Sequence, residues 1–175
     1  FLKIFALLGL IFMIPFLFVC SLFIFLEDGL PILFTQKRLG KNMRVFNIIK
    51  IRTMKNNTPN IGTHENASSD FLKIGKIIRK FKLDEFPQLI NFLSGSINLV
   101  GPRPCLPNQT ELKKARELRD VFLVKPGITG LSQILGYDMS NPEMLSIVDK
   151  IYIKNSSASL NIIIFFATFF SPLKK

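Results

Sequence analysis

Asp84 and Glu85 are adjacent acidic residues in a strongly basic chain, and their neighbours suggest phosphate chemistry. The 175-residue sequence has a formal net charge of +11. Arg79 lies five residues before the aspartate, and Arg103 follows within twenty residues, in a Gly-Pro-Arg-Pro segment. Carboxylates bind Mg²⁺ together with substrate phosphates, and the arginine fork matches phosphate oxygens. These four residues therefore form a candidate site for a metal ion and a phosphorylated substrate.

The acidic pair also has an ordinary structural interpretation. Asp84 is followed by Pro87 and then by apolar residues up to Ser94-Gly95, which predicts a helix with Asp84 as its N-cap. Taken alone, the pair fits capping better than catalysis. The two interpretations are compatible, because the unsatisfied N–H groups at a helix start attract anions.

Composition gives its clearest structural prediction for the N-terminal segment. No charged residue occurs from Ile4 to Leu26, a length that crosses a bilayer of roughly 30 Å if the segment is helical. We therefore predict a membrane-embedded helix over residues 1–28. Pro15 near its middle predicts a kink or break. A helix that spans the membrane and a re-entrant helix that returns to the same side are both compatible with this pattern.

Charge and cysteine usage indicate which side of the membrane the rest of the chain occupies. Seven lysines and arginines, and no acidic residue, lie between Lys37 and Lys55, which by the positive-inside rule places this segment in the cytoplasm. Cys20 and Cys105 lie in unrelated segments, and free thiols fit a reducing compartment. We expect membrane lipids as partners and no nucleic acid, because no nucleic-acid-binding motif occurs and membrane attachment explains the basic charge.

We expect residues 29–175 to form a small catalytic domain at the cytoplasmic face, giving an α+β, mainly helical protein with short strands and amphipathic interfacial helices. The expected elements are strands at 30–34, 45–49 and 97–100, a basic turn at 36–40, a polar loop at 55–69, a helix at 71–81 capped by Asp70, a charged helix at 111–119, a strand-like stretch at 128–136 and an apolar helix at 160–170.

Five segments, in this order, resemble the bacterial sugar transferase family, the small monotopic phosphoglycosyl transferases. They are Phe34-x-Gln36-x-Arg38-x-Gly40, Phe46-x-Ile48-x-Lys50-x-Arg52-Thr53-Met54, Leu83-Asp84-Glu85-Phe86-Pro87-Gln88-Leu89, Leu99-Val100-Gly101-Pro102-Arg103-Pro104 and Lys125-Pro126-Gly127-Ile128-Thr129-Gly130. The resemblance runs over nearly the whole chain, and the order of the motifs makes it more specific than any one of them.

The resemblance implies a reaction and roles for individual residues. The family transfers a sugar phosphate from a UDP-sugar to polyprenyl (undecaprenyl) phosphate with release of UMP, using Mg²⁺, in the first membrane step of glycoconjugate biosynthesis. Asp84 matches the nucleophile that forms a covalent phosphosugar intermediate, and Glu85 matches its acidic partner, so both are candidate metal ligands. Arg79 and Arg103 are expected to bind phosphate or nucleotide. Lys50 and Arg52 are weaker candidates for the same task.

The resemblance also implies a re-entrant helix, broken at a Ser-Pro pair, in the bacterial cytoplasmic (inner) membrane, with the active site at the cytoplasmic face. Here Ile14 precedes Pro15, so the serine hydroxyl that can bond a freed carbonyl is missing. The alternative function is a catalytically silent membrane anchor or scaffold of a glycan-assembly complex. The sugar is not encoded in any motif, and the segments 55–69 and 105–120 are candidates for determining it.

Overall fold

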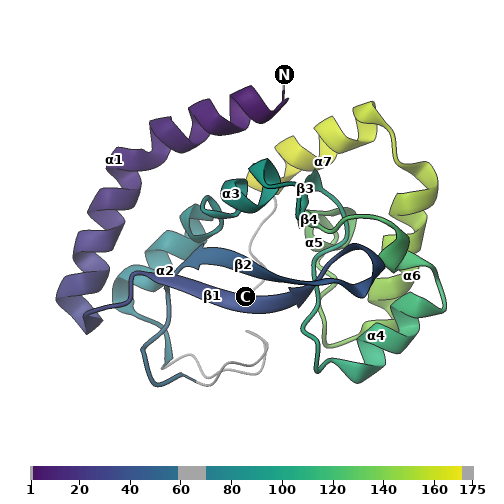
Figure 1. Cartoon of the computed structure of the whole chain (residues 1–175), viewed down its shortest axis with the longest axis horizontal. Coiled ribbons are helices and arrows are strands. Elements are labelled where there is room, and N and C mark those ends of the chain that lie inside the picture. The colour runs from purple at the N-terminus through teal and green to yellow at the C-terminus, as the bar shows by residue number, and fades with distance from the viewer. Residues whose placement is uncertain (1, 59–69, 171–175) are drawn as a thin grey trace. The chain divides into compact units, whose positions relative to one another are not determined.

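The computed structural model describes residues 2–58 and 70–170, so most of the predicted 55–69 loop lies outside the described residues (Figure 1). The chain folds into two compact units. The first unit comprises Phe1–Gln36 and Asn47–Ser94, and the second comprises Lys37–Phe46 and Gly95–Lys175. The described elements are mostly helices with a few short strands, which confirms the α+β, mainly helical prediction.

The apolar N-terminal segment forms one helix, α1 (Leu2–Asp28), which is long and apolar enough to cross a membrane. Among the described residues it is the one helix that meets both criteria. The helix continues through Pro15, and Figure 1 shows it bending about half-way along its length instead of separating into two helices. Most of its large apolar side chains are exposed, as in a helix covered by lipid. This exposed apolar surface indicates membrane association.

Both ends of α1 contact other elements of the first unit. Near its start, Lys3 Nζ donates a hydrogen bond of 3.0 Å to the carbonyl oxygen of Leu93. At its end, the carboxylate of Asp28 pairs with the guanidinium of Arg52. The helix also contributes two side chains to the buried core of this unit, which consists of Cys20, Ile24, Ile51, Leu72 and Ile78. The C-terminal half of this long apolar helix is therefore part of the folded unit.

Strands β1 (Leu33–Leu39) and β2 (Val45–Ile51) pair in a two-stranded sheet. β2 confirms the strand predicted at 45–49. The prediction of a basic turn at 36–40 was wrong, because residues 36–39 belong to β1 and the turn follows from Gly40 into η1 (Lys41–Met43). Burial alternates there, with Gln36 and Arg38 buried and Lys37 exposed. Arg38 is accommodated inside because its Nη1 donates to the carbonyl oxygen of Pro104 at 3.0 Å.

Helix α2 (Lys73–Lys80) confirms the helix predicted at 71–81, but its start is stabilised differently. Leu72 occupies the N-cap position and makes no side-chain cap. The carboxylate of Glu27, at the end of α1, instead accepts hydrogen bonds from the backbone N–H groups of Lys73 at 2.7 Å and Ile74 at 3.1 Å. A carboxylate at this position satisfies unpaired donors and favours the helix dipole. The prediction of Asp70 as the cap was wrong because the capping group comes from a distant part of the chain.

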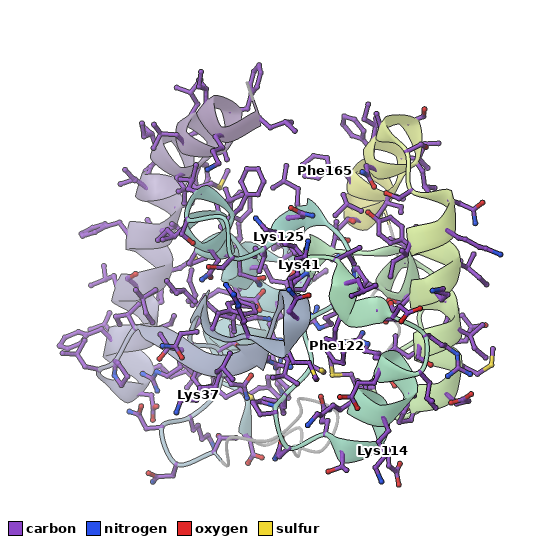
Figure 2. The ribbon with its side chains drawn as sticks, turned by 45° about the vertical axis from the view of Figure 1, so that its right-hand side comes forward. Lys37, Lys41, Lys114, Phe122, Lys125 and Phe165 are labelled. Carbon is purple, nitrogen blue, oxygen red and sulfur yellow. The ribbon has the colours of Figure 1, made fainter. Side chains whose placement is uncertain are left out.

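The second unit is built around strands β3 (Asn98–Val100) and β4 (Gly127–Thr129), which pair in parallel with Asn98 opposite Gly127. Its helices are α4 (Thr110–Glu117), α5 (Leu131–Ile134), α6 (Pro142–Asn155) and α7 (Ala158–Phe170). One core cluster contains Leu39, Cys105, Leu112 and Leu145, with Phe122 packed against it; a second contains Val100, Tyr152 and Ile164. In Figure 2, Lys114 projects outward from α4.

Two segments of the second unit differ from expectation. The stretch at 128–136 is a strand only as far as Thr129, after which α5 begins. Helix α6 had no counterpart among the predicted elements. The apolar helix expected at 160–170 is present as α7, and it leaves Ile162, Ile163 and Phe166 exposed.

Candidate active site

Asp84 and Glu85 lie in a short 3₁₀ turn, η4 (Leu83–Glu85), between helices α2 and α3 (Gln88–Leu93). Lys82, immediately before the turn, has a left-handed backbone with φ of 56°, a conformation that is not part of a right-handed helix. Asp84 is only 6% exposed. The predicted N-cap role was wrong: α3 begins at Gln88, and Pro87 occupies its N-cap position. The turn, and not a helix start, therefore presents the aspartate.

The structure brings Lys50 of β2 to the acidic pair. Lys50 Nζ lies 3.2 Å from Glu85 Oε1, and the two side chains are 15% and 17% exposed. Helix α3 holds the same strand through Asn91, whose Oδ1 accepts from the Ile49 N–H at 3.0 Å and whose Nδ2 donates to the Asn47 carbonyl at 2.8 Å. These hydrogen bonds of the Asn91 side chain fix the distance between β2 and the segment that carries Asp84. The fold of the unit therefore holds Lys50 and Glu85 in contact.

Arg79 lies in the last turn of α2, just before η4. Its guanidinium carbon is 4.8 Å from the centroid of the Phe71 ring, within the range of a cation–π contact. The aromatic face holds the long side chain in one place, which reduces the entropy lost when it engages an anion. Arg79 and Asp84 are thus placed by consecutive elements of the first unit.

Arg52 has a different environment from the other basic candidates. It is 4% exposed, and its guanidinium pairs with the Asp28 carboxylate. It also donates to the carbonyl oxygens of Pro31 at 2.6 Å and Gly29 at 2.6 Å. Asn56 supports the same carboxylate through its backbone N–H at 2.9 Å. These contacts show Arg52 anchoring the end of α1 to the end of β2, a role that its motif did not indicate.

Arg103 belongs to the second unit, where it lies half-buried in the Gly101–Pro104 turn. The structure therefore places five of the six predicted site residues in the first unit. Asp84 and Glu85 lie in η4, Lys50 contacts Glu85, and Arg79 lies in the preceding helix α2. Arg52 lies in the same unit, at the end of α1.

The donor set at η4 limits how a metal ion would be held. In the described part of the chain, no group of three or more histidine, cysteine, aspartate or glutamate side chains is arranged to bind a metal. Asp84 and Glu85 supply two carboxylates, and Glu85 already interacts with Lys50. Mg²⁺ is commonly bound by one or two carboxylates, with substrate phosphates and water completing its ligands. The residues present fit an ion that binds together with a phosphorylated substrate.

Comparison with known proteins places this site in a family. The sequence matches the family described as bacterial sugar transferase over residues 2–175. The chain belongs to the bacterial sugar transferase family. The match includes α1, so the long apolar helix is part of what this sugar transferase chain shares with the family.

Three curated relatives illustrate the similarity. The UDP-N-acetylgalactosamine-undecaprenyl-phosphate N-acetylgalactosaminephosphotransferase of Aeromonas hydrophila is 34% identical, with 88% of this chain and 38% of the relative covered. The uncharacterized sugar transferase EpsL of Bacillus subtilis is 37% identical over 78% of this chain and 67% of the relative. The UDP-glucose:undecaprenyl-phosphate glucose-1-phosphate transferase of Caulobacter vibrioides is 37% identical over 70% of this chain and 47% of the relative. This sugar transferase chain therefore spans less than half of the two relatives whose names specify a reaction.

Proposed function

We propose that the chain is a phosphoglycosyl transferase that moves a sugar phosphate from a UDP-sugar to polyprenyl phosphate and releases UMP. The observation that carries the proposal is the buried Asp84 beside the Lys50–Glu85 pair, in a chain of the bacterial sugar transferase family. The names of two relatives, which specify UDP-sugar-derived donors and undecaprenyl phosphate as acceptor, support the same donor and acceptor classes here.

Asp84 would act as the nucleophile in the first of two steps. One carboxylate oxygen attacks the phosphorus that bears the sugar; a P–O bond forms, and the bond from that phosphorus to the bridging oxygen breaks, so that UMP leaves with the electron pair. In the second step, an oxygen of polyprenyl phosphate attacks the same phosphorus and displaces the carboxylate. The burial of Asp84 favours the attack, because a poorly hydrated carboxylate is a stronger nucleophile.

Glu85 would help to bind the metal ion beside the nucleophile, and Lys50 would orient Glu85. The carboxylates of Asp84 and Glu85 would hold Mg²⁺ together with substrate phosphates, and the bound ion would supply positive charge for the phosphate oxygens. The Lys50 ammonium orients the Glu85 carboxylate through their 3.2 Å contact. Arg79, held against Phe71, and Arg103 are proposed ligands of phosphate or nucleotide. The contacts of Arg52 with the end of α1 favour a positioning role for it over substrate binding.

The proposal is tested by screening several UDP-sugars for UMP release with the membrane-extracted protein and polyprenyl phosphate. A covalent intermediate also requires labelled UMP to exchange into the UDP-sugar when no lipid acceptor is present. Release without such exchange would point to direct transfer between the two substrates. A protein that binds no UDP-sugar would instead favour the scaffold function.

The Lys50–Glu85 pair gives a specific expectation. Substituting Lys50→Met removes the cation beside a half-buried carboxylate, and charge-assisted contacts of this kind contribute about 1.5–3 kcal/mol. We expect kcat/KM for UMP release to fall by at least about tenfold. Lys76→Met is the matched control, because Lys76 is an exposed lysine of α2. Equal losses of kcat/KM in the two variants would show that Lys50 has no specific role at the site.

We further propose that α1 is re-entrant, with both ends at the cytoplasmic face of the bacterial inner membrane. Its two ends contact the same unit, through Lys3 and Leu93 at one end and Asp28 and Arg52 at the other. In a chain with the native cysteines replaced, single cysteines at positions 3 and 30 should both resist a membrane-impermeant thiol reagent in intact cells and both react after permeabilisation. Labelling of position 3 alone in intact cells would show that α1 spans the membrane.

A further inference from the structure

The turn that carries Arg103 is held by its backbone carbonyl oxygens. Four consecutive carbonyls, from Pro102 to Cys105, accept hydrogen bonds from donors that other segments of the second unit supply. The donors are Gly127 N at 3.0 Å to Pro102, Arg116 Nη1 at 2.8 Å to Arg103, Arg38 Nη1 at 3.0 Å to Pro104 and Leu39 N at 2.9 Å to Cys105. Two of these donors are buried arginine side chains, which is an unusual use of charge for fixing a turn.

Arg116 is the most enclosed of these donors. It is 2% exposed, and its Nε and Nη2 lie 3.0 Å and 2.6 Å from Asp149 Oδ2. Asp149 is 1% exposed and accepts a third bond, of 3.1 Å, from the hydroxyl of Ser132. Burial raises the pKa of Asp149, an effect that the Arg116 charge and the Ser132 hydrogen bond oppose. Helices α4, α5 and α6 thus meet in one buried polar cluster, Arg116–Asp149–Ser132.

The geometry of the guanidinium explains why an arginine is needed here. One edge of the fork, Nε and Nη2, faces Asp149, and the remaining nitrogen, Nη1, faces the Arg103 carbonyl. A lysine ammonium has no planar fork that serves an acid and a carbonyl in two fixed directions. The orientation of the carbonyl fixes the peptide plane after Arg103 and therefore restricts the direction in which the Arg103 side chain leaves the backbone.

The rest of the turn cannot compensate for a lost contact by moving. Pro102 and Pro104 have fixed φ angles, which leaves Arg103 between two rigid neighbours. A Cβ atom on Gly101 would lie 2.8 Å from Gly127 N and 2.9 Å from the Lys125 carbonyl oxygen, so the start of the turn is packed directly against another backbone. The orientation of the Arg103 peptide therefore depends mainly on its hydrogen bond with Arg116.

We propose that the buried Arg116–Asp149 pair is a positioning device that sets the direction of the Arg103 guanidinium for phosphate or nucleotide binding. The proposal rests on the proposed function, which assigns Arg103 to that ligand. Arg116 itself touches no substrate. Its effect on binding is exerted through Arg103 and disappears when the Arg103 side chain is absent.

The test measures UMP binding by calorimetry and KM for the UDP-sugar on the detergent-extracted protein. UMP is the product common to all UDP-sugar donors, so the experiment does not depend on knowing the sugar. We expect Arg116→Lys to weaken UMP binding and raise KM by about tenfold, with a smaller change in kcat. Arg119→Lys is the matched control: Arg119 lies in the turn just after α4 and pairs with Glu143 at the surface, and its substitution should leave both values unchanged.

A double-mutant cycle separates positioning from general damage to the fold. In an Arg103→Ala background, Arg116→Lys should weaken UMP binding by less than about twofold, because its path of action is already removed. An undiminished tenfold loss in that background would overturn the proposal, as would unchanged UMP binding in either single variant. If Arg116→Lys does not fold, Ser132→Ala removes only the third bond to Asp149 and should show a weaker effect, about threefold, that also vanishes with Arg103→Ala.

The same data distinguish this inference from the function on which it rests. A wild-type protein that binds no UMP would overturn both. A wild-type protein that binds UMP and depends on Arg103, with no response to Arg116→Lys, would overturn the positioning role and leave the proposed function intact.

Discussion

Replacing Asp84 with asparagine is expected to abolish UMP release from a UDP-sugar, with turnover reduced by at least about 10³-fold. The amide has nearly the same shape as the carboxylate but cannot attack phosphorus. Asp84 is 6% exposed, and the amide occupies the same volume, so the variant should still fold. The measurements are UMP release, labelled UMP exchange without lipid acceptor, and trapping of a labelled sugar phosphate on the protein.

Asp120→Asn provides a matched control for this variant. Asp120 also lies beside a 3₁₀ turn, and its left-handed backbone, with φ of 58°, is a conformation that asparagine tolerates. Its exposed pair with Lys150, at 3.3 Å, contributes little to stability. We expect this variant to keep wild-type release and exchange. Wild-type-like exchange by Asp84→Asn would rule out this residue as the nucleophile.

Substituting Gly75→Ala should produce the largest loss of stability in the first unit. A Cβ atom at this position of α2 would lie 2.2 Å from the carbonyl oxygen of Thr53 and 2.9 Å from its carbon, both backbone atoms that cannot rotate away. The same carbonyl accepts a hydrogen bond of 3.1 Å from the Leu72 N–H, which is lost if α2 moves. We expect the free energy of unfolding to fall by about 3 kcal/mol or more.

This substitution should also reduce UMP release, because Arg79 lies one turn further along α2 and η4 follows directly. Thermal unfolding in detergent and UMP release are the two measurements. The control is Gly9→Ala, another helical glycine of the first unit, where the nearest atom is Leu89 Cδ1 at an ordinary 3.9 Å. A Gly75→Ala protein with the melting temperature of Gly9→Ala would show that α2 does not pack on Thr53 in solution.

Sequence patterns predicted the elements that repeat a simple period. The uncharged segment of α1, the β-branched run of β2 and the apolar run of α7 were all anticipated from composition. Helix α6 could have been found as well, because Asn141-Pro142-Glu143 is a typical helix start, and Asn141 Oδ1 indeed accepts from the Met144 N–H at 3.1 Å. The strand predicted at 128–136 was too long, because β4 ends at Thr129. The next residue, Gly130, approaches the Gly101 carbonyl closely, a tertiary contact that no local pattern indicates.

The candidate site shows the same division between local and long-range information. The order of motifs singled out Asp84, Glu85 and Lys50, but the Lys50–Glu85 contact joins residues 35 positions apart and follows only from the fold. Lys50 and Arg52 share a motif and alternate positions, yet their environments differ because β2 ends at Ile51. Beyond that point the alternation of the strand no longer determines direction, and Arg52 turns to the end of α1. The Arg116–Asp149 pair carried no motif signal at all.

The way α1 is joined to its unit has a practical consequence for anyone who wants a soluble version of this protein. A chain shortened to begin after Asp28 would lose the carboxylate that Arg52 pairs with while that guanidinium stays enclosed, and α2 would lose the two acceptors at its first turn. It would also leave an empty space where Ile24, which is 0% exposed, fills the core. Deleting the hydrophobic segment would therefore yield an unfolded polypeptide, and solubility has to be sought by replacing the exposed apolar side chains of α1 while keeping Ile24, Glu27 and Asp28.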